Sequence, residues 1–328
     1  MPTNLPPEYF EAEKQHRAAS TPSEKIATLE ELISTIPKHK GTDKLRADLR
    51  RKLSKLKEAS AQRKGASRRE SAFQVDKEGA GQVVVVGPAN VGKSSLVAAL
   101  TNATPEVADY PYTTQLPVPG MMPVDDIQVQ LVDTPPLGRE YTDPQLLNLI
   151  RRADLILLVV DLQANPIEQF EDSLTILREN RIIPLHMKED YPEERRLTFI
   201  PLLTVVNKVD DKELDKDFEA FCELLGGECP MLSFSAMAGR HSERLKRAIY
   251  ERLGIIRIYA KPPGKEPDFS APFVLKKGST VEDFAAKVHR DFVERLKSAR
   301  VWGSGVYAGQ RVGRDHTLHD GDVVELRI

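Results

Sequence analysis

Strand-like and helix-like patterns alternate through the central part of the chain, from Gly81 to about Gly254. Five short segments have the composition of strands: Gln82–Val86, Ile127–Asp133, Leu155–Asp161, Leu202–Val206 and Met231–Phe234. Of these, Ile127–Asp133 alternates between apolar and polar residues. Helical spacing occurs between and after them, in Ser94–Leu100, near Glu168–Asn180 and in Glu243–Leu253. This alternation predicts βαβ units around a mostly parallel sheet. The charged stretch Lys188–Arg196 fits neither pattern.

The N-terminal part predicts two helices after a polar, proline-bearing stretch over residues 1–20. Thr21-Pro22-Ser23-Glu24 is a capping box with proline at the first helical position, and a second start lies at Thr42-Asp43. Apolar residues at helical spacing follow each start: Ile26, Leu29, Leu32, Ile33 and Ile36, then Leu45, Leu49, Leu53 and Leu56. We expect a helical hairpin, followed by a linker over Gly65–Gly81.

A third pattern begins near Ile256. It predicts strands at Ile256–Ala260 and Phe273–Leu275, one helix from Thr280 carrying Phe284, Val288, Phe292 and Leu296, and a closing strand at Val323–Ile328. The sequence therefore predicts three parts: a basic helical hairpin and linker over residues 1–80, an α/β domain over 81–254, and a small α+β domain over 255–328.

The composition of the chain indicates where the protein is located and where its charge is concentrated. The 328 residues carry a net charge of −2, yet the stretch from Lys38 to Arg69 contains 13 Lys and Arg and only three acidic residues. That block is either a solvated helix face or a contact for a polyanion. Two cysteines form no metal or disulfide pattern, and the longest apolar run, Leu155–Val160, is too short for a bilayer. We expect a cytoplasmic protein without a membrane segment.

The strongest motif is Gly-Pro-Ala-Asn-Val-Gly-Lys-Ser at Gly87–Ser94, which lies between a predicted strand and a predicted helix. This is the phosphate-loop pattern in its required context. Backbone N–H groups and the helix N-terminus favour phosphate there, and Lys93 is expected to reach the β- and γ-phosphates. The predicted nucleotide-binding residues of the loop are Gly87, Asn90, Val91, Gly92, Lys93, Ser94 and Ser95.

Asn207-Lys208-Val209-Asp210 follows the buried strand Leu202–Val206 and identifies the base. A carboxylate at Asp210 can accept from N1–H and the exocyclic amine of guanine, whereas adenine would leave it unpaired. Lys208 is expected to cover the base, and the Ser235-Ala236 backbone is expected to donate to guanine O6. These residues predict GTP and GDP as ligands.

Magnesium ligands are predicted at three positions. The Ser94 hydroxyl would bind Mg²⁺ directly, and Asp133, at the end of the strand Ile127–Asp133, would hold it through water. Thr114 in Tyr110-Pro-Tyr-Thr-Thr114 is favoured over Thr113 as the switch I residue that closes over the γ-phosphate and Mg²⁺.

Together these motifs resemble Obg-related translation-factor GTPases. Arg257-Ile-Tyr-Ala-Lys-Pro-Pro-Gly-Lys, Thr280-Val-Glu-Asp-Phe, Val301-Trp-Gly and Gly313-Arg-Asp-His-Thr-Leu resemble the developmentally regulated GTP-binding protein family, with its C-terminal TGS domain. The resemblance covers most of the chain. It implies a P-loop GTPase domain, a TGS domain of β-grasp fold, and a ribosomal or rRNA partner; it leaves a regulatory protein partner open.

The chain departs from that family pattern in ways that bear on hydrolysis. The family's inserted domain after Asp133 is absent or much reduced, and Pro136 replaces a glycine whose N–H normally bonds the γ-phosphate. Leu137 stands where Ras-type GTPases have the water-orienting glutamine. Asn90 stands where Obg-like and related GTPases use asparagine to help bind K⁺.

We therefore expect slow GTP hydrolysis in which Lys93, Thr114 and Asn90 participate, with K⁺ at Asn90 supplying positive charge. Two alternatives stay open at this point: a GTP-binding adaptor with little hydrolysis, and an Obg-like ATPase, against which Asp210 argues.

Overall fold

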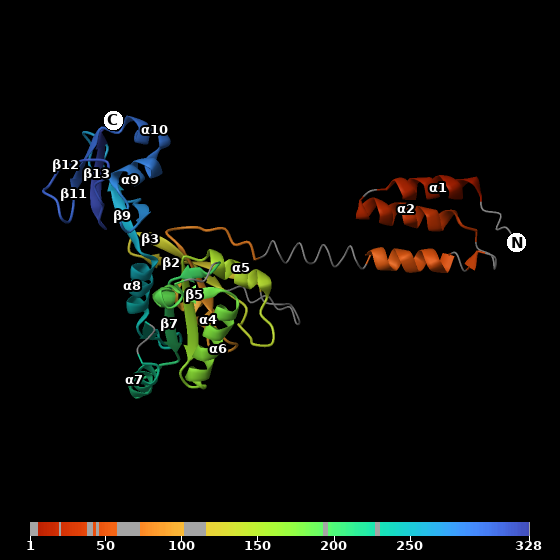
Figure 1. Ribbon diagram of the computed structural model, residues 1–328, viewed down its shortest axis with the longest axis horizontal. Helices are drawn as coiled ribbons and strands as arrows, with labels where there is room; N and C mark the ends of the chain where they lie inside the picture. Colours follow the sequence, from red (N-terminus) through yellow and green to blue (C-terminus); the bar gives the residue numbers. More distant parts are fainter. Residues whose placement is uncertain are drawn as a thin grey trace. The chain divides into compact units, whose positions relative to one another are not determined.

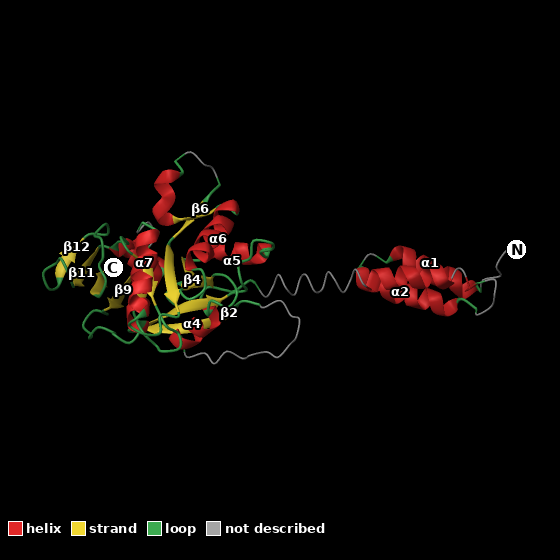
Figure 2. Ribbon diagram, turned by 90° about the horizontal axis from the view of Figure 1, so that it is seen from below, coloured by secondary structure: helices red, strands yellow, loops and turns green. Residues whose placement is uncertain are grey.

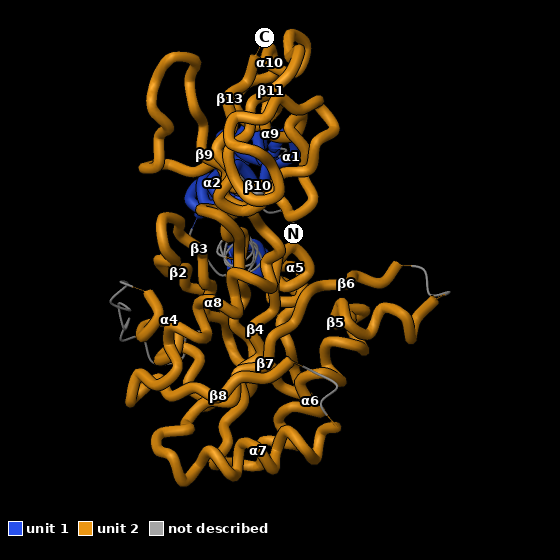
Figure 3. Tube along the Cα trace, turned by 90° about the vertical axis from the view of Figure 1, so that its left-hand side faces the viewer, with its two compact units in different colours: residues 1–72 blue, residues 73–328 orange. Residues whose placement is uncertain are grey.

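The computed structural model describes residues 6–19, 21–37, 42–43, 46–57, 73–101, 116–192, 196–226 and 230–327. It divides into two compact units, Met1–Ala72 and Phe73–Ile328, coloured separately in Figure 3.

The first unit is helical (Figure 1). It contains α1 (Pro7–Ala18), α2 (Pro22–Thr35) and a helix over residues 46–57. The predicted capping box at Thr21 is present, since its hydroxyl accepts from Glu24 N at 3.2 Å. The helices share a core of Tyr9, Ala12, Leu29, Leu32, Ile36 and Leu49. The predicted hairpin thus has an additional helix, α1, in front of it.

The second unit begins with a six-stranded sheet, whose strands are yellow in Figure 2. The strand order is β2-β3-β1-β4-β7-β8. The parallel strands are β1 (Gln82–Val86), β3 (Ile127–Asp133), β4 (Leu155–Asp161), β7 (Leu202–Asn207) and β8 (Met231–Ser233). The edge strand β2 (Val118–Val124) pairs with β3 in the antiparallel sense, and its sequence pattern had not predicted it.

Helices cover both faces of this sheet. One face packs against α5 (Pro144–Arg152), α6 (Pro166–Glu179) and α7 (Leu214–Leu224), and the other against α4 (Lys93–Leu100) and α8 (Ser242–Leu253). The β1 side chains alternate between these two cores: Val84 and Val86 belong to the first, Val83 and Val85 to the second. Because both faces are buried, the strands read as continuous apolar runs.

The charged stretch without a predicted assignment lies beside this sheet. It falls partly in the 3₁₀ helix η1 (Leu185–Asp190), which joins β5 (Ile182–Pro184) and β6 (Thr198–Ile200). These two strands form a small parallel sheet of their own.

The C-terminal part has a five-stranded sheet in the order β10-β9-β13-β11-β12. Its strands are β9 (Ile255–Ala260), β10 (Phe273–Lys276), β11 (Ser298–Trp302), β12 (Gln310–Val312) and β13 (Asp322–Arg327). The central β9 and β13 are parallel, and Phe284 on α9 (Val281–Val288) lies in the core with Ile258 and Val324. A helix packed on a mixed sheet in this way is the expected β-grasp arrangement.

The prediction of one continuous helix to Leu296 is wrong. The helix stops at His289, which has extended backbone (φ −167°, ψ 144°), and α10 (Arg290–Arg295) starts anew. The His289 ring accepts from Asp291 N at 3.2 Å and so caps the second helix. The apolar spacing continues across this break, and for that reason the pattern did not reveal it.

An ion-pair cluster joins the C-terminal sheet to the β2–β3 hairpin. Arg257 on β9 donates from Nη1 to Asp125 at 3.0 Å and to Asp126 at 2.8 Å. It also donates from Nε and Nη2 to the two carboxylate oxygens of Asp320, at 3.2 and 2.9 Å. The hairpin holding Asp125 and Asp126 ends at Asp133, a predicted site residue, so the cluster connects the small domain to the strand that carries the site.

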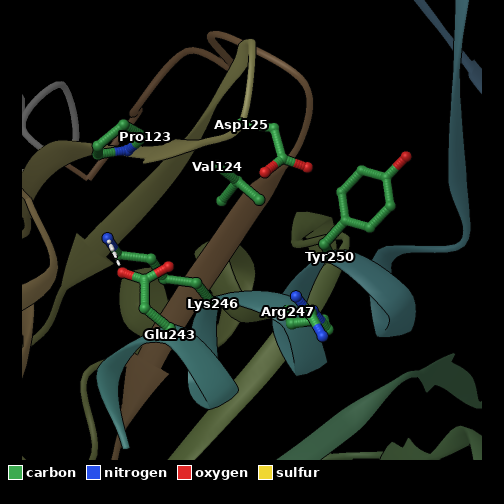
Figure 4. Close-up of a pocket in the computed structure, with 7 residues that line it drawn as sticks. All are labelled: Pro123, Val124, Asp125, Glu243, Lys246, Arg247 and Tyr250. Carbon is green, nitrogen blue, oxygen red and sulfur yellow. Dashed lines mark hydrogen bonds and ion pairs between the residues drawn. The ribbon is translucent and has the colours of Figure 1, made fainter. Parts of the chain in front are cut away.

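Two tyrosines complete this junction. Tyr250 on α8 donates to Asp320 at 2.6 Å, and Tyr259 donates to Asp126 at 2.5 Å. Burial, together with the bond to Asp126, raises the pKa of Tyr259 to about 12. A cavity of about 220 Å³ adjoins this junction. Figure 4 shows the residues that line it: Pro123, Val124, Asp125, Glu243, Lys246, Arg247 and Tyr250. None of the predicted nucleotide residues lines this cavity.

Candidate nucleotide site

The phosphate loop connects β1 to α4 and requires glycine at two positions. Gly87 has φ +148°, and a Cβ there would lie 2.3 Å from the Val159 carbonyl oxygen. Gly92 has φ +88°, and a Cβ there would lie 2.4 Å from Asn207 Nδ2. Both the backbone conformation and the lack of space exclude larger residues. The loop therefore packs closely against β4 and against the predicted base-recognition segment.

Lys93 begins α4 and is 7% exposed. Its ammonium group donates to Gly87 O at 3.0 Å and Pro88 O at 2.6 Å, so it is folded back over the loop. Burial lowers the pKa of Lys93 to about 8, although the nearby Asp133 charge acts in the opposite direction. A buried cation bonded to two carbonyl oxygens, with one carboxylate nearby, suits a site that receives a more strongly anionic group.

Ser94 and Asp133 meet beside Lys93. The Ser94 hydroxyl donates to Asp133 Oδ2 at 2.5 Å. Asp133 Oδ1 is buried, and among the described residues it has no hydrogen-bond partner. Burial raises the pKa of Asp133, opposed by the Ser94 bond and the Lys93 charge. A buried carboxylate oxygen next to a hydroxyl fits a hydrated Mg²⁺, since hard oxygen ligands and water are what this ion prefers.

Asn207 links the two predicted halves of the site. Its side chain is 2% exposed, and Nδ2 donates to Val91 O of the phosphate loop at 2.9 Å. Its Oδ1 accepts from Ala236 N at 3.2 Å, in the loop after β8. One amide thus fixes three segments that are far apart in sequence. This satisfies both ends of a buried polar side chain.

Asp210 is oriented by the loop after β8. Ser235 Oγ donates to Asp210 Oδ1 at 2.5 Å and accepts from Ala238 N at 2.9 Å. Lys208 adopts a positive φ of 66° and pairs with the buried Asp161 at 2.5 Å. In the sequence, Asp161 is only the last residue of a predicted strand. Its role in holding Lys208 depends on β4 lying beside β7, which no local pattern shows.

The remaining predicted positions are distributed as follows. Asn90 is exposed at φ 63°, and Ser95 is exposed in the first turn of α4. Leu137 is 4% exposed, its N–H donates to Gly87 O at 3.0 Å, and the neighbouring Pro136 is exposed. Thr113 and Thr114 lie outside the described residues, as does Cys229.

The described ranges contain neither a metal-binding cluster nor a membrane-spanning helix. No group of three or more metal-ligating side chains is found in them, and this includes His316 and His319. No helix in those ranges combines the length and apolarity required to cross a bilayer.

A phosphate loop on a mostly parallel sheet, joined by Asn207 to an Asn-Lys-x-Asp segment and followed by a β-grasp domain, defines a P-loop GTPase with a TGS domain. The family described as 50S ribosome-binding GTPase matches residues 82–191, and the TGS domain family matches residues 256–328. The chain belongs to the developmentally regulated GTP-binding protein family of Obg-related GTPases.

Full-length relatives support this assignment. A GTP-binding protein of Methanocaldococcus jannaschii is 34% identical over 93% of this chain and 92% of its own length. Developmentally-regulated G-protein 2 of Arabidopsis thaliana is 28% identical over 92% of this chain and 90% of its own length. The aligned lengths of 364 and 365 exceed the 328 residues of this chain, so these relatives carry residues that it lacks.

A solved structure shows the same fold. The GTP-binding protein from Pyrococcus horikoshii OT3 superposes with a TM-score of 0.50 and 18% identity, covering 75% of this chain and 99% of that one.

Proposed function

We propose that this protein is a guanine-nucleotide switch that acts in translation or ribosome function through contacts with the ribosome or its RNA. It would bind GTP and GDP with Mg²⁺ and hydrolyse GTP slowly to GDP and phosphate in the cytoplasm. The bond from Asn207 to Val91 O carries the nucleotide part, because it ties the base segment to the phosphate loop. The ribosomal part is supported by the description of the matching GTPase family and by the basic N-terminal block.

In this proposal the phosphates lie against the loop Gly87–Ser94. Lys93 would exchange its bonds to two loop carbonyls for the β- and γ-phosphates. The backbone N–H groups from Val91 to Ser95, at the start of α4, would bind the β-phosphate. Ser94 and Asp133, with Thr114 from switch I, are the proposed Mg²⁺ ligands. When bound, the ion would supply positive charge that neutralises the β- and γ-phosphate oxygens.

The base lies between Lys208 and the Ser235-Ala236 backbone. Asp210 accepts from N1–H and the amine of guanine, and Ser235 fixes that carboxylate by its 2.5 Å bond. Lys208 packs its stem along the base while its ammonium group stays paired with Asp161. An ATPase is disfavoured, because adenine would leave the oriented Asp210 without a donor. Displacement of a bound fluorescent guanine nucleotide by GTP and by ATP tests this preference directly.

Hydrolysis in the proposal is slow because Leu137 is buried and cannot orient water. Asn90 is then the candidate K⁺ ligand, and the cation replaces the positive charge that an arginine finger supplies elsewhere. We expect multiple-turnover phosphate release to be faster in K⁺ than in Na⁺, and Asn90→Ala to remove the difference between the two salts. Equal rates of wild type in the two salts would remove the K⁺ part of the proposal.

A GTP-binding adaptor is the second candidate, favoured by Pro136, which has no N–H for the γ-phosphate. Phosphate release in K⁺ with ribosomes present separates the two. A rate above that of Lys93→Ala supports the switch, and a rate no higher than that of this variant supports the adaptor.

The helix over residues 46–57 is the proposed RNA-contacting surface. Arg50, Arg51, Lys52, Lys55 and Lys57 on it are exposed, and Lys57 pairs with Glu30 of α2 at 2.6 Å. Phosphate contacts release counterions, so RNA affinity is expected to fall steeply with salt. Arg50→Gln with Lys55→Gln should flatten the slope by about two. Lys14→Gln with Lys25→Gln, on the other helices, is the matched control and should leave the slope unchanged; deleting residues 1–70 should flatten it most.

A further inference from the structure

Arg240 lies in the loop between β8 and α8 and contacts the base-recognition segment from the outside. Its Nη1 donates to Val209 O at 3.0 Å and also to Asp211 O. These two carbonyls belong to the residues directly before and after Asp210. The guanidinium group therefore holds the peptide units on both sides of the carboxylate predicted to read guanine.

The other side of the guanidinium group is held by α7. Nη2 donates to Asp215 Oδ1 at 3.2 Å and Oδ2 at 3.0 Å, and the Arg240 side chain is only 22% exposed. The backbone carbonyl of Arg240 accepts from Ser235 N at 3.4 Å, and Ser235 in turn bonds Asp210. Arg240 thus touches both loops that surround the base, through its side chain and through its main chain.

We propose that Arg240 is a positioning residue for guanine selectivity, acting through Asp210 and oriented by Asp215. This inference rests on the proposed function, because it assigns the site a guanine base. Two features distinguish the contact from an ordinary surface ion pair. The donors reach backbone carbonyls as well as a carboxylate, and only the planar fork of arginine can serve all of them at once, which a lysine cannot.

Loss of Arg240 is expected to affect recognition of the guanine N1–H and exocyclic amine, the groups that Asp210 binds. A carboxylate held in place accepts from N1–H and the amine together, whereas a displaced one loses the bidentate geometry. Inosine diphosphate lacks the amine but keeps N1–H and both phosphates. Loss of Arg240 should therefore weaken GDP binding more than inosine diphosphate binding, while a defect in the phosphate loop would weaken both equally.

The test measures dissociation constants of Mg²⁺-GDP, Mg²⁺-inosine diphosphate and Mg²⁺-ADP for the full chain. For Arg240→Gln we expect GDP affinity to fall about tenfold. The ratio of the inosine diphosphate dissociation constant to that of GDP, which is the GDP-over-inosine preference, should shrink by several fold. Asp215→Asn should change the same ratio in the same direction but less, and the double variant should be no worse than Arg240→Gln, because the two act on one contact. Arg240→Lys should recover only part of the preference.

Arg244→Gln is the control, since Arg244 is exposed on the next helix, and it should match wild type. Thermal unfolding of each variant reports on structural damage. An unchanged GDP-over-inosine ratio in Arg240→Gln and Asp215→Asn, whatever the loss of stability, would overturn the inference while leaving the guanine site intact. A wild type that binds ADP as well as GDP would instead refute the guanine site, and the inference with it.

Discussion

At the scale of single residues, the candidate site is built from buried and half-buried polar groups whose partners come from distant parts of the chain. The chemistry of guanine predicts a carboxylate at Asp210, and the position of the motifs after two strands predicts Asn207 and Ser235. The contacts of Lys208 with Asp161 and of Arg240 with two backbone carbonyls were not predictable. They depend on which strands and loops become neighbours, and a single sequence does not contain that information locally.

Lys93 gives a pH prediction. Its pKa of about 8 in the free protein lies below the value of 10.5 for an exposed lysine, because the side chain is buried. Phosphate favours the charged form and raises this pKa, so GDP binding at about pH 8.5 should take up most of one proton. At about pH 7 Lys93 is already charged in the free protein, and no uptake is expected from it. Calorimetry in buffers of different ionisation enthalpy measures the proton number.

The same lowered pKa of Lys93 makes the stability of the folded protein depend on pH. The unfolded chain binds more protons than the folded one between about pH 8 and 10.5, so Lys93 lowers the stability of the nucleotide-free protein below that window and less so as the pH rises through it. Lys93→Met should remove this contribution. Equal proton uptake on GDP binding at the two pH values would contradict the assignment of Lys93 to the phosphates.

At the scale of elements, strong periodic patterns predict structure well and interruptions do not. The continuous apolar runs predicted β1, β4 and β7, because strands buried on both faces have no polar alternation. The alternating pattern of Ile127–Asp133 predicted β3. β2 was missed because Pro119, Gly120 and Pro123 occur within it; as an edge strand it tolerates them. The break at His289 was missed because the apolar spacing is preserved across it.

The capping box that starts α9 gives an element-scale prediction. Thr280 Oγ1 accepts from Asp283 N, and Asp283 Oδ2 accepts from Thr280 N at 2.8 Å. Thr280→Ala should lower the free energy of unfolding by about 1 kcal/mol, whereas Thr280→Ser keeps the hydroxyl and should cost less. Urea denaturation gives the energies, and hydrogen exchange locates the change. The cap is unimportant if the amides of α9 exchange equally in both variants.

At the scale of the whole molecule, the sequence predicted a GTPase domain and a TGS domain but not how they are joined. Arg257 occurs in a stretch that resembles the family, yet its three carboxylate partners come from a hairpin and a turn that are distant in sequence. Hydrogen bonds to Asp320 raise the pKa of Arg257, while its burial acts against them. The junction is therefore held by charge-assisted bonds around one guanidinium group.

Arg257→Ala should weaken this junction, because it leaves Asp125, Asp126 and Asp320 close together without their shared cation. We expect a loss of about 1–3 kcal/mol in stability, with faster hydrogen exchange in β9 and in the β2–β3 turn. Arg300→Ala, at an exposed position on β11, is the control and should leave both regions protected. If exchange in the β2–β3 turn is unaltered in Arg257→Ala, the guanidinium group does not hold the two domains together.

The central claim is that the bound nucleotide controls contact with the ribosome. Co-sedimentation of the protein with ribosomes, in K⁺ at physiological salt, should be compared with GDP, GTP and a non-hydrolysable GTP analogue. We predict stronger binding with GTP and the analogue than with GDP, which would also show that switch II responds to the γ-phosphate despite Pro136. Equal binding in all three states, or none in any, would contradict the account.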